Sequence, residues 1–120
     1  MKISLIFPGQ GSQYVGMSKE LVENFKEAEL VYEEASEAIK VNLLALSQDG
    51  PEESLTLTEN AQPAILATSY AWATVLKREL GIQPFAGAGH SLGEYTALLF
   101  SGALSLTDAV SLVRKRGQLM

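Results

Sequence analysis

The sequence predicts an α/β fold in which parallel strands are covered by helices. Two short apolar runs, at 2–7 and 82–88, lead into glycine-rich turns, as buried strands do. Between and after these runs, apolar residues recur three and four positions apart, which is typical of amphipathic helices. Strands that alternate with helices favour a parallel sheet with a helical cover.

The first half of the chain supplies one strand and several helices. Residues 2–7, "KISLIF", are the first strand, and "GQGSQYVG" after Pro8 is a loop. From 18 to 40 the pattern is helical, with a break near 24–26 that divides it into two helices. "NLLALSQ" is a further short helix that stops before Pro51. The apolar face of the 18–40 segment comprises Leu21, Val22, Phe25, Leu30, Val31, Ala35, Ala38 and Ile39.

The segment 60–80 has the strongest helical pattern in the chain. We expect Asn60 to cap this helix, with Pro63 in the first turn, where a missing backbone N–H does no harm. Gly81 is expected to end it. The predicted buried face comprises Ala61, Ile65, Thr68, Trp72, Val75, Leu76 and Leu80.

The remaining elements are a strand at 82–88, a helix at 92–101 ending at Gly102, and a last helix beginning near Ser105. Ser105 and Asp108 have the spacing of a capping box. The last helix still continues where the sequence stops at 120. Two strands are too few for a sheet with protected edges. We therefore expect residues 1–120 to be the N-terminal part of a larger domain.

The composition is that of a folded protein and argues against several classes of function. Of the 120 residues, 47% are hydrophobic, and the net charge of -5 makes nucleic acid a poor partner. The absence of cysteine excludes disulfides and thiolate nucleophiles, and the single histidine makes a zinc or iron site unfavourable. The N-terminal apolar run is too short for a signal peptide or a membrane span. We expect a cytoplasmic protein without a metal.

The motif "GHSLG" at 89–93 places a serine between two glycines, after a predicted strand and before a predicted helix. This is the context of a nucleophile elbow, in which a tight turn pushes the Ser91 hydroxyl away from the backbone. Amides just after Ser91 can then stabilise an oxyanion. Two other interpretations stay open: a glycine-rich connection without chemistry, and a dinucleotide-binding loop. The second requires an acidic residue after the next strand, whereas Asp108 lies at the start of a helix.

A nucleophilic serine needs a base, and the one histidine of the chain, His90, is its direct neighbour. Adjacent side chains at such a turn point in different directions, so His90 cannot serve as that base. We expect His90 to be packed or hydrogen-bonded beside the elbow. The base must then lie in sequence outside these 120 residues.

Two further segments are candidates for a role at this site. "FPGQGSQ" at 7–13 is by default a plain turn, but if the two strands are neighbours, Gln10 can donate a hydrogen bond to the same oxyanion. The basic run 114–116 is usually a solvated face. One of its arginines can instead grip a carboxylate through two parallel hydrogen bonds.

Four blocks, "FPGQGSQ", "TENAQPA", "GHSLGEYTAL" and "RKRGQLM", together resemble the malonyl-CoA:acyl carrier protein transacylase family of fatty acid synthesis. The resemblance runs in order from 1 to 120. It implies a partial α/β-hydrolase-like core that stops before the family's ferredoxin-like subdomain and its catalytic histidine. It assigns Ser91 as the nucleophile and Gln10 and Leu92 as the oxyanion hole. The substrate-binding residues are then Arg116 for the malonate carboxylate, Gln62 and His90.

The implied activity is a ping-pong transfer of malonyl from coenzyme A to acyl carrier protein through a seryl ester, without a cofactor. The implied partners are malonyl-CoA and acyl carrier protein. Lys77, Arg78 and Arg114 are candidate contacts for an acidic carrier protein. Two alternatives remain: a serine esterase or thioesterase, and a non-catalytic chain that only binds acyl-CoA or a partner.

Overall fold

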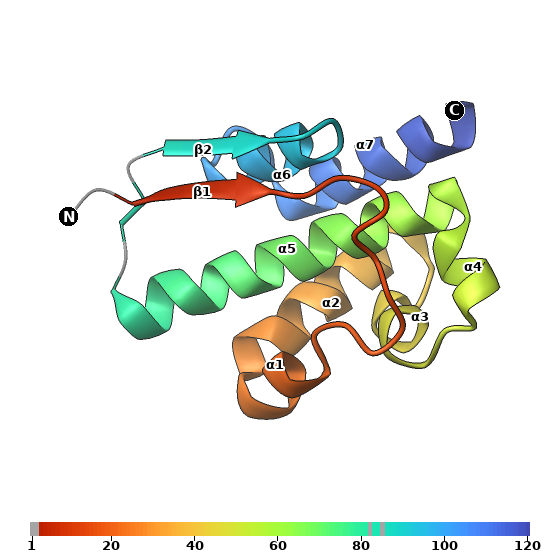
Figure 1. Ribbon diagram of the computed structural model, residues 1–120, viewed down its shortest axis with the longest axis horizontal. Coiled ribbons are helices and arrows are strands. Elements are labelled where there is room, and N and C mark those ends of the chain that lie inside the picture. The colour runs from red at the N-terminus through yellow and green to blue at the C-terminus, as the bar shows by residue number, and fades with distance from the viewer. Residues whose placement is uncertain (1–2, 82, 85) are drawn as a thin grey trace.

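The computed structural model describes residues 3–81, 83–84 and 86–120 and shows an α/β arrangement (Figure 1). The predicted strands are present as β1 (Ser4–Phe7) and β2 (Ala86–Gly89). They pair in parallel, with Ser4 opposite Ala86 and Phe7 opposite Gly89. Positions 82 and 85 of the predicted second strand and positions 1–2 lie outside the described residues. The parallel pairing confirms the predicted α/β fold with parallel strands.

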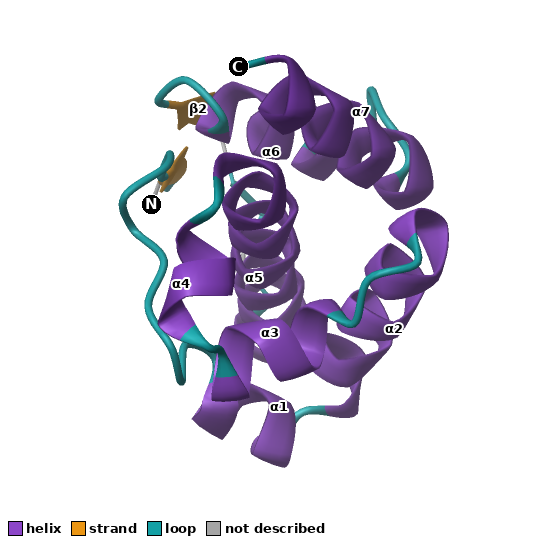
Figure 2. Ribbon diagram, turned by 90° about the vertical axis from the view of Figure 1, so that its right-hand side faces the viewer, coloured by secondary structure: helices purple, strands orange, loops and turns teal. Residues whose placement is uncertain are grey.

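The helices follow in the predicted order, with one addition. Their bounds are α1 (Lys19–Asn24), α2 (Lys26–Ile39), α3 (Leu43–Asp49), α4 (Glu52–Thr56), α5 (Thr58–Leu80), α6 (Gly93–Phe100) and α7 (Leu106–Leu119). Helix α5 runs through the middle and contacts α2, α3, α4, α6 and α7 (Figure 2). Helix α6 packs against both strands. Among the described residues, no helix combines the length and apolarity needed to cross a bilayer.

The division of the 18–40 segment into two helices is confirmed. Phe25 is extended, with φ -134° and ψ 114°, and separates α1 from α2. Leu21, Val31 and Ala35 are buried as predicted, but Leu30 is exposed. Helix α4 was assigned to no element in the sequence analysis, because five residues are too few to show a helical period.

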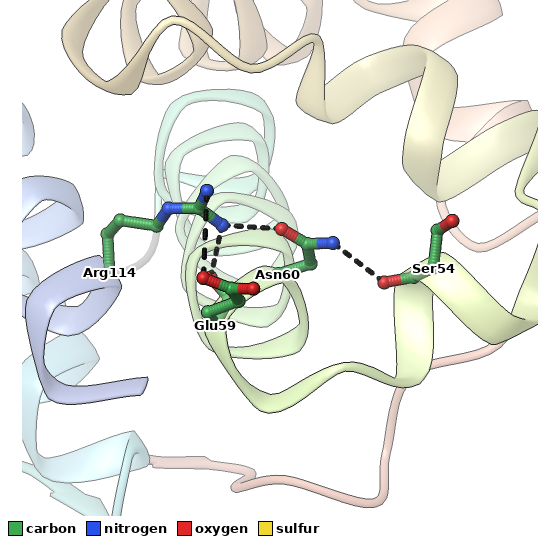
Figure 3. Close-up of polar contacts among 4 residues, drawn as sticks. All are labelled: Ser54, Glu59, Asn60 and Arg114. Carbon is green, nitrogen blue, oxygen red and sulfur yellow. Dashed lines mark hydrogen bonds and ion pairs between the residues drawn. The ribbon is translucent and has the colours of Figure 1, made fainter. Parts of the chain in front are cut away.

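The predicted start of α5 is wrong. The helix begins at Thr58 rather than after Asn60, so Pro63 is its sixth residue and lies beyond the first turn. Because proline has no N–H, the Glu59 carbonyl four residues earlier loses its helical donor. Arg114 of α7 supplies one instead, with Nη1 2.9 Å from that carbonyl oxygen (Figure 3). A tertiary contact thus permits a proline at a position that local rules disfavour. At the other end, Gly81 takes φ 63° and ends α5 as predicted.

The predicted buried face of α5 is only partly correct. Ala61, Ile65 and Val75 are buried, but Trp72 and Leu80 are exposed. The helix is instead covered on several sides at its N-terminal half, where Ala64, Leu66 and Ala67 are also buried. Trp72 borders an open, mainly apolar pocket of about 300 Å³ between α5 and β1, together with Ile6 and Tyr14.

The last two helices agree with the sequence analysis. Gly102, with φ 90°, follows α6. The Ser105 hydroxyl accepts a hydrogen bond of 3.1 Å from the Asp108 amide and caps α7. Helix α7 packs against α5 and carries the basic run 114–116 along it.

Candidate functional site

The turn between β2 and α6 has the conformation of a nucleophile elbow. Strand β2 ends at Gly89 and α6 begins at Gly93, which leaves three residues for the turn. Ser91 in its centre has φ 54°, a left-handed conformation that non-glycine residues rarely adopt. Ser91 is also exposed. A strained and exposed serine at such a corner is typical of a functional position.

The two glycines of the motif are required by close backbone approach. A Cβ on Gly89 would lie 1.9 Å from the carbonyl carbon of Gly93. A Cβ on Gly93 would lie 2.1 Å from the carbonyl oxygen of Phe7, at the end of β1. No side chain fits at such distances, so helix α6 can start this close to both strands only with glycine at these two positions.

One backbone donor at the start of α6 remains available. The Gly93 amide donates to the His90 carbonyl and the Glu94 amide to the Ser91 carbonyl, both at 3.0 Å. The Leu92 amide has no acceptor among the described residues. The Leu92 side chain is completely buried and anchors the turn. A free amide directly after the serine is what stabilisation of an oxyanion requires.

The loop after β1 packs against this elbow, as expected for neighbouring strands. The His90 amide donates to the Phe7 carbonyl at 3.2 Å, and a Cβ on Gly9 would lie 2.6 Å from the His90 carbonyl oxygen. Gln10 follows Gly9 and is exposed. Its side chain donates to the Thr58 hydroxyl of α5 at 3.0 Å. The glutamine loop is therefore held between the elbow and the first residue of α5.

Arg116 of α7 lies directly at the serine. Its Nη2 donates to Ser91 Oγ at 2.9 Å, and its Nη1 donates to Gln62 Oε1 at 2.8 Å. The guanidinium carbon is 5.5 Å from the centre of the Tyr95 ring, a distance at which a cation is attracted by an aromatic face. The alternative that the basic run is only a solvated face is thus wrong for Arg116, whereas Lys115 is exposed.

Gln62 holds one side of that guanidinium. Its side chain is fully buried, and both of its polar atoms have partners: Oε1 accepts from Arg116, and Nε2 lies 3.0 Å from Met120 Sδ. A buried amide that is satisfied at both ends has one stable orientation. Gln62 therefore presents a fixed acceptor to Arg116.

The structure brings Ser91, Leu92, Gln62 and Arg116 to one place, with the Gly9–Gln10 loop beside them. His90 belongs to the elbow through its backbone, but the residue is exposed rather than packed as expected. The contact that the structure gives Ser91 Oγ within the described residues comes from a guanidinium, which donates protons and cannot accept one. Also within those residues, no three metal-ligating side chains gather at one point.

Sequence reasoning missed two contributors. Tyr95 is four residues after Ser91, so the helical period after the elbow could have placed it beneath the site. Arg114 is predicted to contact a carrier protein at the surface, but its side chain is three-quarters buried and bonded to Glu59 and Asn60. The other two expected carrier-protein contacts are more exposed: Arg78 pairs with Glu27 at 2.9 Å, and Lys77 lies 5.8 Å from the Phe100 ring centre.

Comparison with known proteins agrees with this geometry. Residues 4–120 match the acyl transferase domain family. The chain is 54% identical to the malonyl CoA-acyl carrier protein transacylase of Bacillus subtilis (strain 168) over 119 residues, which cover 99% of this chain and 37% of that protein. This chain therefore spans little more than a third of the length of that relative.

Solved structures superpose closely. An acyl carrier protein S-malonyltransferase from Vibrio cholerae has a TM-score of 0.95 and 48% identity, covering 100% of this chain and 39% of that one. A malonyl-transacylase solved in complex with a type II PKS acyl-carrier protein has a TM-score of 0.95 and 44% identity, with coverages of 99% and 38%. On these grounds the chain belongs to the acyl transferase domain family.

Proposed function

We propose that this chain forms the nucleophile-bearing part of an enzyme that transfers a malonyl group from coenzyme A to acyl carrier protein. The observation that carries the proposal is the contact between Arg116 and Ser91, at 2.9 Å. A serine placed for acyl transfer beside a guanidinium fork suits an acyl group with a free carboxylate. The names of the relatives and of the complex with a carrier protein support this substrate pair.

The first half-reaction forms a seryl ester. Ser91 Oγ attacks the thioester carbonyl carbon while its proton passes to a base, which we place in sequence outside these residues. The C–S bond then breaks, and coenzyme A leaves as the thiol after taking up that proton. The Leu92 amide and a donor from Gln10 stabilise the negative oxygen that forms in between. In the second half-reaction the pantetheine thiol of acyl carrier protein gives its proton to the same base and attacks the ester carbonyl. The bond to Ser91 Oγ then breaks, and that oxygen takes the proton back from the base, which restores the free serine.

Arg116 selects the acyl group in this proposal. Gln62 occupies one arm of the guanidinium, and the arm that donates to Ser91 Oγ can turn to the malonyl carboxylate once the ester has formed. An acetyl group has no carboxylate and would leave that arm without this charged partner. We expect the difference to favour malonyl by about 2–5 kcal/mol.

The proposal also covers the domain to which these residues belong. We propose that residues 1–120 are the N-terminal part of an α/β-hydrolase-like domain, with a ferredoxin-like subdomain and the catalytic histidine in the remainder. The reaction uses protein groups and two thioester carriers, so we propose no metal and no further cofactor. His90 is placed beside the entering acyl group. We propose a cytoplasmic location because both carriers belong to fatty acid synthesis.

The experiment that tests the proposal is detection of the malonyl-enzyme. We expect the full-length protein, incubated with malonyl-CoA, to gain the mass of one malonyl group, and Ser91→Ala to gain none. Ser111→Ala, an exposed serine on α7, is the matched control and should still be acylated. An adduct that persists in Ser91→Ala would place the nucleophile elsewhere. Release of free malonate without transfer to carrier protein would favour a hydrolase.

A further inference from the structure

Arg114 of α7 lies against the first turn of α5, where it contacts Glu59 and Asn60 (Figure 3). The carbonyl of Glu59 would normally accept from the amide at position 63, which proline lacks. Arg114 Nη1 occupies the place of that donor, 2.9 Å from the Glu59 oxygen. The charged side chain therefore replaces the helical donor that this backbone carbonyl lacks near the site.

The guanidinium of Arg114 joins α7 to α5, and Asn60 continues the contact to a third helix, α4. Its Nη1 also donates to Asn60 Oδ1, and its Nη2 is 4.0 Å from the Glu59 carboxylate. The Asn60 amide nitrogen in turn donates to the Ser54 carbonyl of α4 at 2.9 Å. Because the Arg114 side chain is only 23% exposed, solvent weakens these contacts less than it weakens a surface ion pair.

The packing next to Arg114 leaves α7 little freedom. Gly117 follows Arg114 by three residues and so lies on the same face of the helix. A Cβ on Gly117 would be 2.7 Å from Glu59 Cα and 2.8 Å from the Thr58 carbonyl oxygen. Helix α7 thus touches the first turn of α5 backbone to backbone at Gly117, and Arg114 holds it there by hydrogen bonds.

Arg116 lies between these two contacts in sequence and extends toward Gln62 and Ser91. Its fork reaches both acceptors at the present rotation of α7 about its axis. We propose that Arg114 is a positioning residue: it replaces the amide that Pro63 lacks and so sets the rotation of α7 that places Arg116 between Gln62 and Ser91. The effect on acyl selectivity rests on the proposed function, whereas the effect on Arg116 itself does not.

The test is a double-mutant cycle in the full-length protein, with Arg114→Ala and Pro63→Ala alone and combined. The readout is the ratio of Ser91 acylation rates with malonyl-CoA and acetyl-CoA. We expect Arg114→Ala to lower this ratio about tenfold, the effect of losing hydrogen bonds made by a charged group. In the Pro63→Ala background the helix supplies its own amide to Glu59, so the loss on removing Arg114 should be smaller there. Lys115→Ala, on the same helix but exposed, is the control and should leave the ratio unchanged.

A second readout does not depend on activity. The side-chain Nε–H signal of Arg116 in NMR spectra should move in Arg114→Ala and return toward its original position in the double variant. If the unaltered protein takes up no malonyl, the proposed function fails while this signal still tests the positioning role. If Arg114→Ala leaves both the Arg116 signal and the ratio of acylation rates unchanged, the inference is overturned, even if this variant melts at a lower temperature. It is also overturned if removing Arg114 lowers the ratio of acylation rates equally in the unaltered protein and in the Pro63→Ala variant. Arg114→Lys, which keeps one donor for the Glu59 carbonyl, should restore part of both readouts and replaces Arg114→Ala if that variant does not fold.

Discussion

At the scale of single residues, the site depends on Arg116 having two acceptors from different helices. Gln62 of α5 holds one arm at 2.8 Å, and Ser91 before α6 receives the other at 2.9 Å. The position of the guanidinium is therefore set before any substrate arrives. A preorganised cation of this kind loses little entropy when a carboxylate binds.

Replacement of Arg116 should change the acyl preference rather than abolish acylation. We expect Arg116→Ala to lower kcat/KM for malonyl-CoA by at least about 30-fold, corresponding to about 2 kcal/mol, and to favour acetyl-CoA in relative terms. Arg116→Lys keeps the charge but not the planar fork, so it should recover only part of the preference. The measurement is kcat/KM for both thioesters. An unchanged preference in Arg116→Ala would move the carboxylate contact to another residue.

The buried Tyr32 leads to a separate prediction, about the pH dependence of stability. Burial raises the pKa of Tyr32 above its ordinary value of 10.0, although hydrogen bonds with Ser18 and Thr68 oppose this shift. A raised pKa means that the neutral phenol stabilises the fold fully below pH 10.0 and that this contribution is lost as the pH rises further. Tyr32→Phe should also be less stable near neutral pH, by about 1–3 kcal/mol, because it removes the hydrogen-bond partner of Ser18 and Thr68.

The check is the free energy of unfolding in urea from pH 8 to about pH 11. The unaltered protein should lose more stability over this range than Tyr32→Phe does. Parallel curves for the two proteins would show that Tyr32 does not titrate differently in the folded state.

At the scale of elements, the sequence located most helices because their signals are local. Gly81 ended α5, and Ser105 capped α7, as their residue types predict. The predicted start of α5 is wrong because a hydrogen-bond donor from α7, more than fifty residues away in sequence, makes Pro63 tolerable inside the helix. The prediction that Trp72 is buried is wrong because the apolar period shows which residues share a helix face, not whether another element covers that face.

The elbow should tolerate no side chain at its second glycine. In Gly93→Ala the new Cβ would meet the Phe7 carbonyl oxygen at 2.1 Å, so α6 would have to move away from β1. We expect a low yield of folded protein and loss of Ser91 acylation. Gly81→Ala, at the C-terminal end of α5, is the control: a Cβ there meets nothing within 4 Å, and only its positive φ of 63° is unfavourable. Normal acylation of Gly93→Ala would contradict the close approach described here.

At the scale of the whole molecule, the sheet side of this chain is open. Two strands lie at the surface with Ile6 81% and Tyr14 64% exposed beside Trp72. Strand edges without partners and exposed apolar side chains favour association between molecules.

We therefore expect the isolated 120-residue chain to associate as its concentration rises, measured by size-exclusion chromatography with light scattering. Ile6→Lys, which places a charge on this surface, should increase the monomer fraction. A control substitution on an exposed polar face, Lys115→Ala, should have no such effect. A chain that stays monomeric at all concentrations and melts sharply would show that this surface needs no cover.

The sequence by itself determined the strand–turn–helix order, the serine between two glycines and the basic run in the last helix. These features follow from backbone chemistry within a few residues: glycine permits close approach, and a repeat of three and four places apolar groups on one face. The residue pattern left open which arginine of the run faces the serine; the family resemblance pointed to Arg116, and the tertiary structure places it there. Only the tertiary structure showed that Arg114 supports a helix instead. That choice depends on the rotation at which α7 packs on α5. We propose that this rotation is set by Arg114, bonded to the Glu59 carbonyl that Pro63 deprives of its helical donor, together with the close contact at Gly117.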